Sequence, residues 1–173
     1  MKWQAKIVLI LLSIVTVNAA AQSPSNDPNG QDTQARGYWV DPSTGLMWTA
    51  RDNCKDVSFR GAVNYCRNLR LAGFSDWKLA NMVELQGIYD KTANAPGLAG
   101  PGKESPSTWH VKGNLFLTGY HWTTLYPMDN RRHPQSGHQY YFDFNEGKPN
   151  DEPSGWPYSS SFMRALCVRS SEK

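Results

Sequence analysis

The sequence predicts an α+β domain in which two helices pack on a small, twisted antiparallel sheet with long loops at one end. Three observations lead to this class: two segments have apolar residues at helical spacing, several short segments read as strands, one of them with alternating residues, and one long interval is rich in proline and glycine. The length of 173 residues suits one domain behind a short leader. We expect this domain to span residues 37–170.

The N-terminus has the features of a secretory signal peptide. Lys2 and Lys6 flank the start of an apolar stretch, and the small residues Ala19 and Ala21 fit the rule for cleavage. A retained anchor helix is the alternative, but the stretch is shorter than the roughly 20 residues that cross a bilayer. We therefore expect residues 1–21 to be removed, so that no transmembrane segment remains and the chain is secreted, periplasmic or on the cell surface.

The next segment, residues 22–36, holds almost nothing that could be buried, and we expect it to be a disordered tether. Loss of Lys2 and Lys6 with the leader lowers the formal net charge from +3 to +1. Proteins that bind nucleic acid usually carry a strong basic footprint. A nearly neutral domain therefore gives no support for a nucleic-acid partner.

A hairpin is expected where the ordered chain begins. Tyr38–Val40 and Leu46–Thr49 are short and rich in apolar residues, and residues 41–45 have proline early and glycine late, as a tight turn requires. These features predict two paired antiparallel strands at the start of the domain.

Two helices follow the hairpin. The first is expected over residues 59–69, capped by Asp56 or Ser58, and the second over residues 82–90. Asn81 and Glu84 resemble a capping box at the start of the second helix. The apolar stripes of the two helices consist of Phe59, Ala62, Val63, Cys66 and Leu69 in the first, and of Met82, Leu85, Ile88 and Tyr89 in the second.

The second half of the chain is expected to be loop and strand. Residues 91–118 contain many prolines and glycines and no sustained period, which predicts a long loop. Strands are expected at residues 120–125, 139–144 and 164–169. In the middle one, Tyr140, Phe142 and Phe144 alternate with Tyr141 and Asp143, which is typical of a half-buried strand.

Three cysteines in an exported chain suggest one disulfide and one free thiol, and three pairings are possible. Cys66 lies on the apolar stripe of the first helix, and Cys167 lies between Leu166 and Val168, so both are expected to be interior. Cys54 lies in the polar segment 51–55. This placement favours a Cys66–Cys167 bond, with Cys54 as the spare thiol.

The order of several short motifs resembles the family named after the C-terminal domain of the Legionella collagen-like protein. The resemblance covers residues 38–169, nearly all of the expected domain, and its specificity lies in the shared order of the pieces. The motifs are Trp39-Val40-Asp41-x-x-Thr44-Gly45-Leu46-Met47-Trp48, Ala62-Val63-Asn64-Tyr65-Cys66-x-x-Leu69, Gly73-Phe74-Ser75-Asp76-Trp77-Lys78-Leu79, Glu84-Leu85, His121-Trp122-Thr123-Thr124 and Cys167-Val168-Arg169.

The resemblance implies a C-type-lectin-like fold whose disulfide ties the first helix to the last strand, which agrees with the pairing of Cys66 and Cys167. It also implies a role in adhesion, since the founding domain is similar to glycan-binding modules and is associated with sulfated polysaccharides. The chain departs from the usual pattern, because Lys78, Ala80 and Asn81 stand where Arg, Pro and Thr are common.

The candidate ligand-binding residues belong to a basic loop and to the aromatic segments beside it. They are Arg131, Arg132, His133, Tyr141 and Lys148. Guanidinium groups bind sulfate or carboxylate through paired donors, and exposed aromatic rings stack on sugars. A merely solvated hairpin loop is the alternative reading of the same residues.

No metal or other cofactor is expected. Calcium-dependent lectins use a Glu-Pro-Asn type loop, and the nearest match here, residues 148–152, begins with Lys148 in place of the first oxygen ligand.

These features predict a non-catalytic binding or adhesion module that recognises a polysaccharide, acidic or sulfated, or another surface polymer. The alternatives are a protein-binding module of the cell envelope and an oxidase of the formylglycine-generating type, which has a similar fold and uses an active cysteine pair. Cys54 and Cys66 could imitate that pair. A bond between Cys66 and Cys167 would exclude it.

Overall fold

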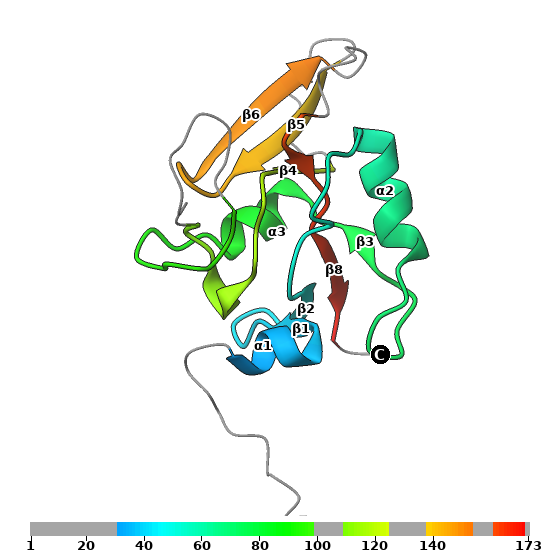
Figure 1. Cartoon of the computed structure of the whole chain (residues 1–173), viewed down its shortest axis with the longest axis vertical. Helices are drawn as coiled ribbons and strands as arrows, with labels where there is room; N and C mark the ends of the chain where they lie inside the picture. The colour runs from blue at the N-terminus through cyan, green and yellow to red at the C-terminus, as the bar shows by residue number, and fades with distance from the viewer. Residues whose placement is uncertain (1–30, 99–108, 125–137, 154–160, 172–173) are drawn as a thin grey trace, which may run out of the picture.

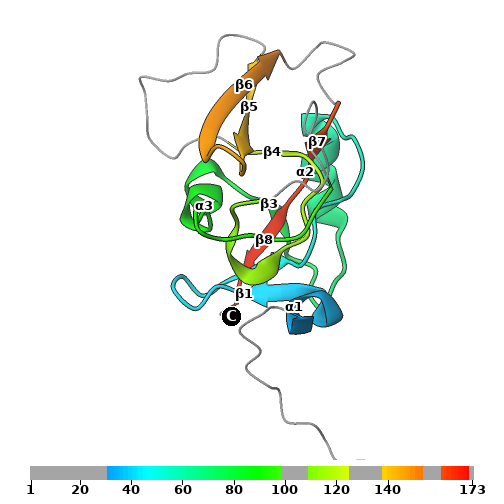
Figure 2. The same cartoon turned by 60° about the vertical axis from the view of Figure 1, so that its left-hand side comes forward.

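A computed structural model of the chain describes residues 31–98, 109–124, 138–153 and 161–171. The predicted signal peptide and residues 22–30 of the predicted tether lie outside these ranges. The described residues form two small four-stranded sheets and three short α-helices, an α+β architecture (Figures 1 and 2). Among their helices, none is long and apolar enough to cross a membrane.

The first sheet is antiparallel throughout, with the order β1–β2–β8–β3. Its strands are β1 (Tyr38–Val40), β2 (Leu46–Thr49), β8 (Cys167–Ser170) and β3 (Lys78–Leu79). The predicted hairpin is confirmed with its bounds, and Trp39 pairs with Trp48 across it. The last strand lies inside the sheet, between the N-terminal hairpin and β3, so the end of the chain closes the fold.

The second sheet has the order β6–β5–β4–β7. Its strands are β6 (Lys148–Pro153), β5 (His138–Asp143), β4 (Tyr120–Trp122) and β7 (Met163–Arg164). β4 and β7 are parallel, and the other neighbours are antiparallel. The hairpin formed by β5 and β6 extends to the end of the molecule opposite α1 (Figures 1 and 2).

Both predicted helices are present, although the second ends earlier than expected. α2 (Phe59–Asn68) is capped by Ser58, one of the two predicted caps, whose side chain accepts a hydrogen bond from the Gly61 amide. α3 (Met82–Gly87) has the predicted capping box of Asn81 and Glu84. The predicted disulfide is confirmed: Cys66 of α2 is bonded to Cys167 of β8, which lies 101 residues further along the chain.

Regular structure is present on the N-terminal side of the predicted boundary at Gly37. Residues Gln31–Arg36 form helix α1, so the prediction of a disordered tether is wrong for these six residues. Thr33 is only 2% exposed, and the side-chain amide of Gln34 donates to the carbonyls of Ala50 and Asn114. A polar side chain of this segment, Gln34, therefore hydrogen-bonds to the domain, although the polar composition of the segment predicts disorder.

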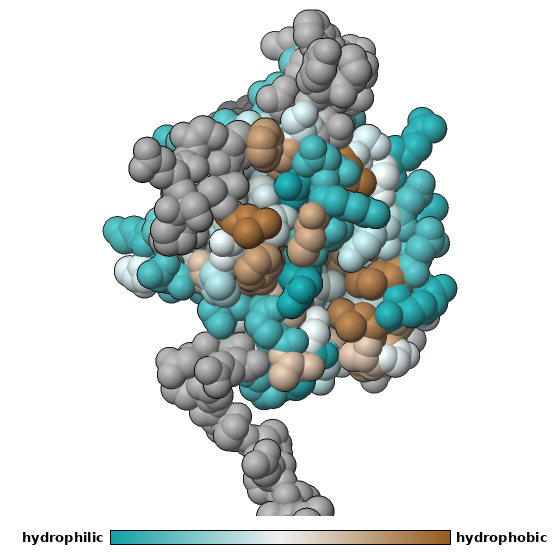
Figure 3. All heavy atoms as spheres, viewed as in Figure 1, coloured by the Kyte–Doolittle hydropathy of each residue, from teal (hydrophilic) through white to brown (hydrophobic). Residues whose placement is uncertain are grey.

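Two hydrophobic clusters fill the interior. The first surrounds Trp48 and Trp109 and includes the buried side of α3, and the second surrounds Trp122 and the Cys66–Cys167 bond beneath α2. Tyr140 and Phe142 pack on the first cluster, whereas Tyr141 packs on the second, so both faces of β5 contact apolar residues. On the face of the molecule in Figure 3, hydrophobic residues form small patches separated by hydrophilic ones.

Three expectations for the second half of the chain need correction. The segment 164–169 is not one strand but two, β7 and β8, which belong to different sheets. Residues 148–153 form strand β6, which was not predicted. The described parts of the expected loop 91–118 include isolated bridges, such as Ala95 to Trp109, because its apolar residues complete the first cluster.

Candidate functional site

Aromatic, amide and charged side chains, which are groups that can bind a ligand, lie together on one face of the second sheet. Tyr141 lies opposite Asn150 in the β5–β6 register, and Asp143 lies opposite Lys148. Because directly paired residues project to the same side of a sheet, these four side chains share a face. The Tyr120 ring of β4 lies beside them, with its centroid 5.4 Å from that of Tyr141. We call Tyr120, Tyr141, Asp143, Lys148 and Asn150 the hairpin face.

The alternation of β5 explains how the two half-buried tyrosine rings are held. Phe142 on the opposite side is fully buried, so it anchors the strand to the core and fixes which side Tyr141 occupies. The Trp122 ring supports Tyr141 edge-on, at 6.4 Å between centroids. Burial, together with the carboxylates of Asp143 and Glu146, raises the pKa of Tyr120 above its usual value. Its phenol is therefore neutral at physiological pH and can donate a hydrogen bond.

The described part of the hairpin face carries little net charge. The Lys148 ammonium lies 3.6 Å from a Glu146 carboxylate oxygen, and both side chains are largely exposed, so this ion pair is weak. The Asp143 carboxylate accepts hydrogen bonds from the amide and the side chain of Asn145, which close the hairpin turn. Aromatic rings and one amide are therefore the main recognition groups that the face offers.

The predicted site residues divide into two groups. Tyr141 and Lys148 lie on the hairpin face, whereas Arg131, Arg132 and His133 lie outside the described residues. These last three occur in the connection that leads from β4 into His138, the first residue of β5.

The segment that resembles a calcium loop is part of β6. Its Asn150 and Asp151 are neighbours in the strand and therefore project to opposite faces. Asp151 instead accepts a hydrogen bond from His138 across the hairpin, at 2.8 Å. Within the part of the chain that the structure describes, no group of three or more His, Cys, Asp or Glu residues is arranged to hold a metal ion.

Sequence reasoning missed a row of arginines on α2. Arg60 and Arg67 are exposed and seven residues apart, which places them on one side of the helix, and Arg70 follows its C-terminal end. Among the described residues, none of these three arginines forms an ion pair with a carboxylate. The seven-residue spacing of Arg60 and Arg67, away from the apolar stripe of the helix, is the feature of the sequence that predicts this exposed basic row. We call Arg60, Arg67 and Arg70 the arginine row.

The free thiol lies beside a buried polar network. Cys54 is exposed, and its backbone amide donates to the buried carboxylate of Asp52. Partial burial and the Asp52 charge raise the pKa of the Cys54 thiol above its usual value. Because the thiolate is the reactive form, this environment makes Cys54 a poor nucleophile.

Comparison with known proteins adds one finding. A family model described as the Lcl C-terminal domain matches residues 16–169, which include all three α-helices and every strand described above apart from Ser170, the last residue of β8. No curated protein and no solved structure matches the chain.

Proposed function

The chain belongs to the Lcl C-terminal domain family, and we propose that it is an exported, non-catalytic module that binds a surface polysaccharide. Family membership and the Cys66–Cys167 bond indicate a secreted, surface-associated protein. We also propose that the domain has a C-type-lectin-like fold. The disulfide between α2 and the last strand supports this assignment, since the fold that the family resemblance implies has a disulfide at this place.

The hairpin face is the observation that carries the proposed function. Two half-buried tyrosine rings, 5.4 Å apart at their centroids and inclined by 35°, form an aromatic surface next to the Asn150 amide. Aromatic rings combine a large apolar surface with a polar group, and an amide both donates and accepts hydrogen bonds. A sugar presents C–H groups on its ring faces and hydroxyls at its edge, so it matches both features.

We propose that the charged part of the site comes from Arg131, Arg132 and His133, with Lys148. This basic tract precedes β5 in the sequence, and His133 lies eight positions before Tyr141, so the tract and one of the two tyrosines belong to the same short segment of the chain. Arginine binds sulfate and carboxylate through two parallel hydrogen bonds. An acidic or sulfated polysaccharide would engage the rings and the guanidinium groups together.

The cysteine chemistry favours binding over oxidase activity. An oxidase of the formylglycine-generating type needs a cysteine pair, but Cys66 is bonded to Cys167 and the raised pKa of Cys54 disfavours its thiolate. We expect no copper-dependent oxygen uptake with a thiol-containing peptide, and a clear uptake trace would support the oxidase.

Retention on a heparin column tests the proposal with a matched control. We expect the purified chain to be retained and to elute at higher salt, and the Arg131→Ala, Arg132→Ala variant to lose most of that retention. The Arg60→Ala, Arg67→Ala variant removes the same charge from the arginine row and should elute close to wild type. If both variants lost the same amount of retention, net charge alone would explain heparin binding, and this result would overturn the assigned site. Passage of the wild-type chain without retention would overturn the acidic ligand and favour a protein partner.

A further inference from the structure

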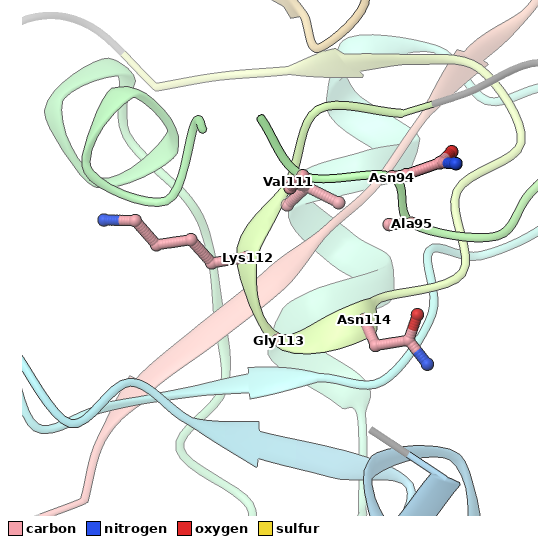
Figure 4. Close-up of a pocket in the computed structure, with 7 residues that line it drawn as sticks. Asn94, Ala95, Val111, Lys112, Gly113 and Asn114 are labelled. Carbon is pink, nitrogen blue, oxygen red and sulfur yellow. The ribbon is translucent and has the colours of Figure 1, made fainter. Parts of the chain in front are cut away.

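A shallow groove of about 260 Å³ lies between the segment after α3 and the segment that leads to β4 (Figure 4), and none of its lining residues belongs to the hairpin face. It is lined by Ala93, Asn94, Ala95, Val111, Lys112, Gly113 and Asn114. Sites for drug-sized ligands usually occupy about 300–1,000 Å³, so this groove suits a single ring-sized group.

The chemistry of the groove is neutral and polar over an apolar base. Ala95 and Val111 are 4% and 1% exposed and belong to the first hydrophobic cluster. Asn94 and Asn114 lie on either side of Ala95, and their carboxamides point the same way in Figure 4. Lys112 extends to the opposite side, toward α3, where its ammonium donates to the Gly87 carbonyl at 2.9 Å. No lining residue carries a carboxylate.

The backbone at the end of the groove is held in an unusual conformation. Gly113 and Asn114 both have positive φ angles, of 73° and 53°. The Asn114 carbonyl accepts a hydrogen bond from the Gln34 side chain of α1. The Trp39 ring occupies the space where a Cβ of residue 113 would lie. These contacts fix the position from which the Asn114 side chain projects.

We propose that this groove binds one neutral sugar unit, with the carboxamides of Asn94 and Asn114 contacting its hydroxyls and its ring resting over Ala95 and Val111. An amide offers both a donor and an acceptor, as a pair of adjacent hydroxyls requires. An ionic ligand is disfavoured, because no lining residue carries a carboxylate and the Lys112 ammonium is hydrogen-bonded to the Gly87 carbonyl. The inference rests on the proposed function only in that both ligands are glycans, because the groove and the hairpin face share no residue.

The test is a titration of the purified, ¹⁵N-labelled chain with glucose, galactose, mannose and N-acetylglucosamine in turn, followed at the side-chain amide signals. We expect saturable shifts of the Asn94 and Asn114 signals with at least one sugar, with a dissociation constant on the order of millimolar. Asn114→Gly should weaken binding about tenfold, because glycine keeps the positive φ and removes the carboxamide. Asn94→Ala should do the same, whereas Asn64→Ala, on the exposed side of α2, should bind like wild type.

Two results would overturn the inference: no sugar shifts the two signals, or both groove variants bind like wild type. Tyr141→Leu separates this inference from the proposed function. It should lose heparin retention but keep the monosaccharide shifts at the groove. Retention without monosaccharide shifts would overturn the groove alone, and shifts without retention would overturn the acidic ligand of the hairpin face alone.

Discussion

The Asp52 carboxylate and the His121 imidazole lie 3.2 Å apart, and both side chains are fully buried. Asp52 follows the first sheet at the end of β2, whereas His121 belongs to β4 of the second sheet. The same carboxylate also accepts hydrogen bonds from the amide and hydroxyl of Thr118 and from the Cys54 amide. One buried carboxylate therefore ties the two halves of the domain together.

We predict that Asp52→Asn destabilises the domain at pH 7 by about 1–3 kcal/mol, because the amide leaves at least one of these buried donors without an acceptor. Burial alone would raise the pKa of Asp52, but the hydrogen bonds from His121, Thr118 and Cys54 outweigh it and lower that pKa. The ionised carboxylate therefore contributes stability above its unfolded pKa of about 3.9 and loses it as the pH falls through the lower folded value.

Urea unfolding from pH 7 to pH 3 tests this prediction. The free energy of unfolding of wild type should approach that of Asp52→Asn in the acid range, as the carboxylate becomes protonated. A difference between the two proteins that stays constant across the whole range would contradict the role given to Asp52.

The Arg169–Asp76 pair should be sensitive to a substitution that keeps the charge. The Arg169 side chain is 1% exposed, donates to both Asp76 oxygens and lies 3.7 Å from the centroid of the Phe74 ring. Lysine cannot make the paired bonds or the planar stacking, so we predict a loss of about 1–3 kcal/mol for Arg169→Lys.

The control for this pair is Lys78→Ala. Lys78 stands where the family commonly has arginine, and its side chain is 55% exposed and paired with Glu84. An exposed ion pair contributes about 1 kcal/mol or less, so this variant should change thermal stability little. A larger loss of thermal stability for Lys78→Ala than for Arg169→Lys would contradict the prediction that the buried Arg169–Asp76 pair contributes more than the exposed Lys78–Glu84 pair.

Two glycine variants separate backbone strain from steric clash. Gly73 and Gly113 have φ angles of 81° and 73°, so alanine is strained at either position. A Cβ at residue 73 meets nothing within 4 Å, but at residue 113 it would lie 2.2 Å from Cδ2 of Trp39. We predict a loss of about 1 kcal/mol for Gly73→Ala and of a further 1–3 kcal/mol or so for Gly113→Ala. Similar melting temperatures for the two variants would show that the Trp39 contact is unimportant.

The disulfide should dominate the response to cysteine removal. In the chain-entropy model, a loop of about 100 residues gives roughly 4.7 kcal/mol, so the Cys66→Ala, Cys167→Ala variant should unfold at a much lower temperature. Cys54→Ser alters an exposed position and should shift stability by about 0.5 kcal/mol or less. Peptide mapping without reductant that joined Cys54 to another cysteine would disprove the pairing.

Local signals explain what the sequence could predict. The hairpin of β1 and β2 follows from a proline-to-glycine turn between short apolar segments, and α2 follows from its apolar stripe. Each depends on residues within a few positions of one another. The alternation in β5 likewise indicated which side Tyr141 occupies, and this side carries the hairpin face.

Long-range contacts explain what could not be predicted. The polar segment 148–153 is a strand only because β5 pairs with it. Asp52 lies in the polar segment 51–55, and the sequence does not reveal its buried network because its partners Thr118 and His121 lie 66 and 69 positions away. The apolar segment 164–169 gives no sign that it leaves one sheet and enters the other between Arg164 and Cys167.

Glycan-array binding of the wild-type chain beside its Tyr141→Leu variant tests whether the hairpin face binds an acidic glycan. Leucine keeps an apolar side chain against the second cluster but removes the ring and hydroxyl from the hairpin face. We predict that wild type binds acidic or sulfated polysaccharides and that Tyr141→Leu loses most of this signal while its melting temperature stays close to wild type. An array on which the wild-type chain binds no glycan, or on which both proteins bind equally, would contradict it.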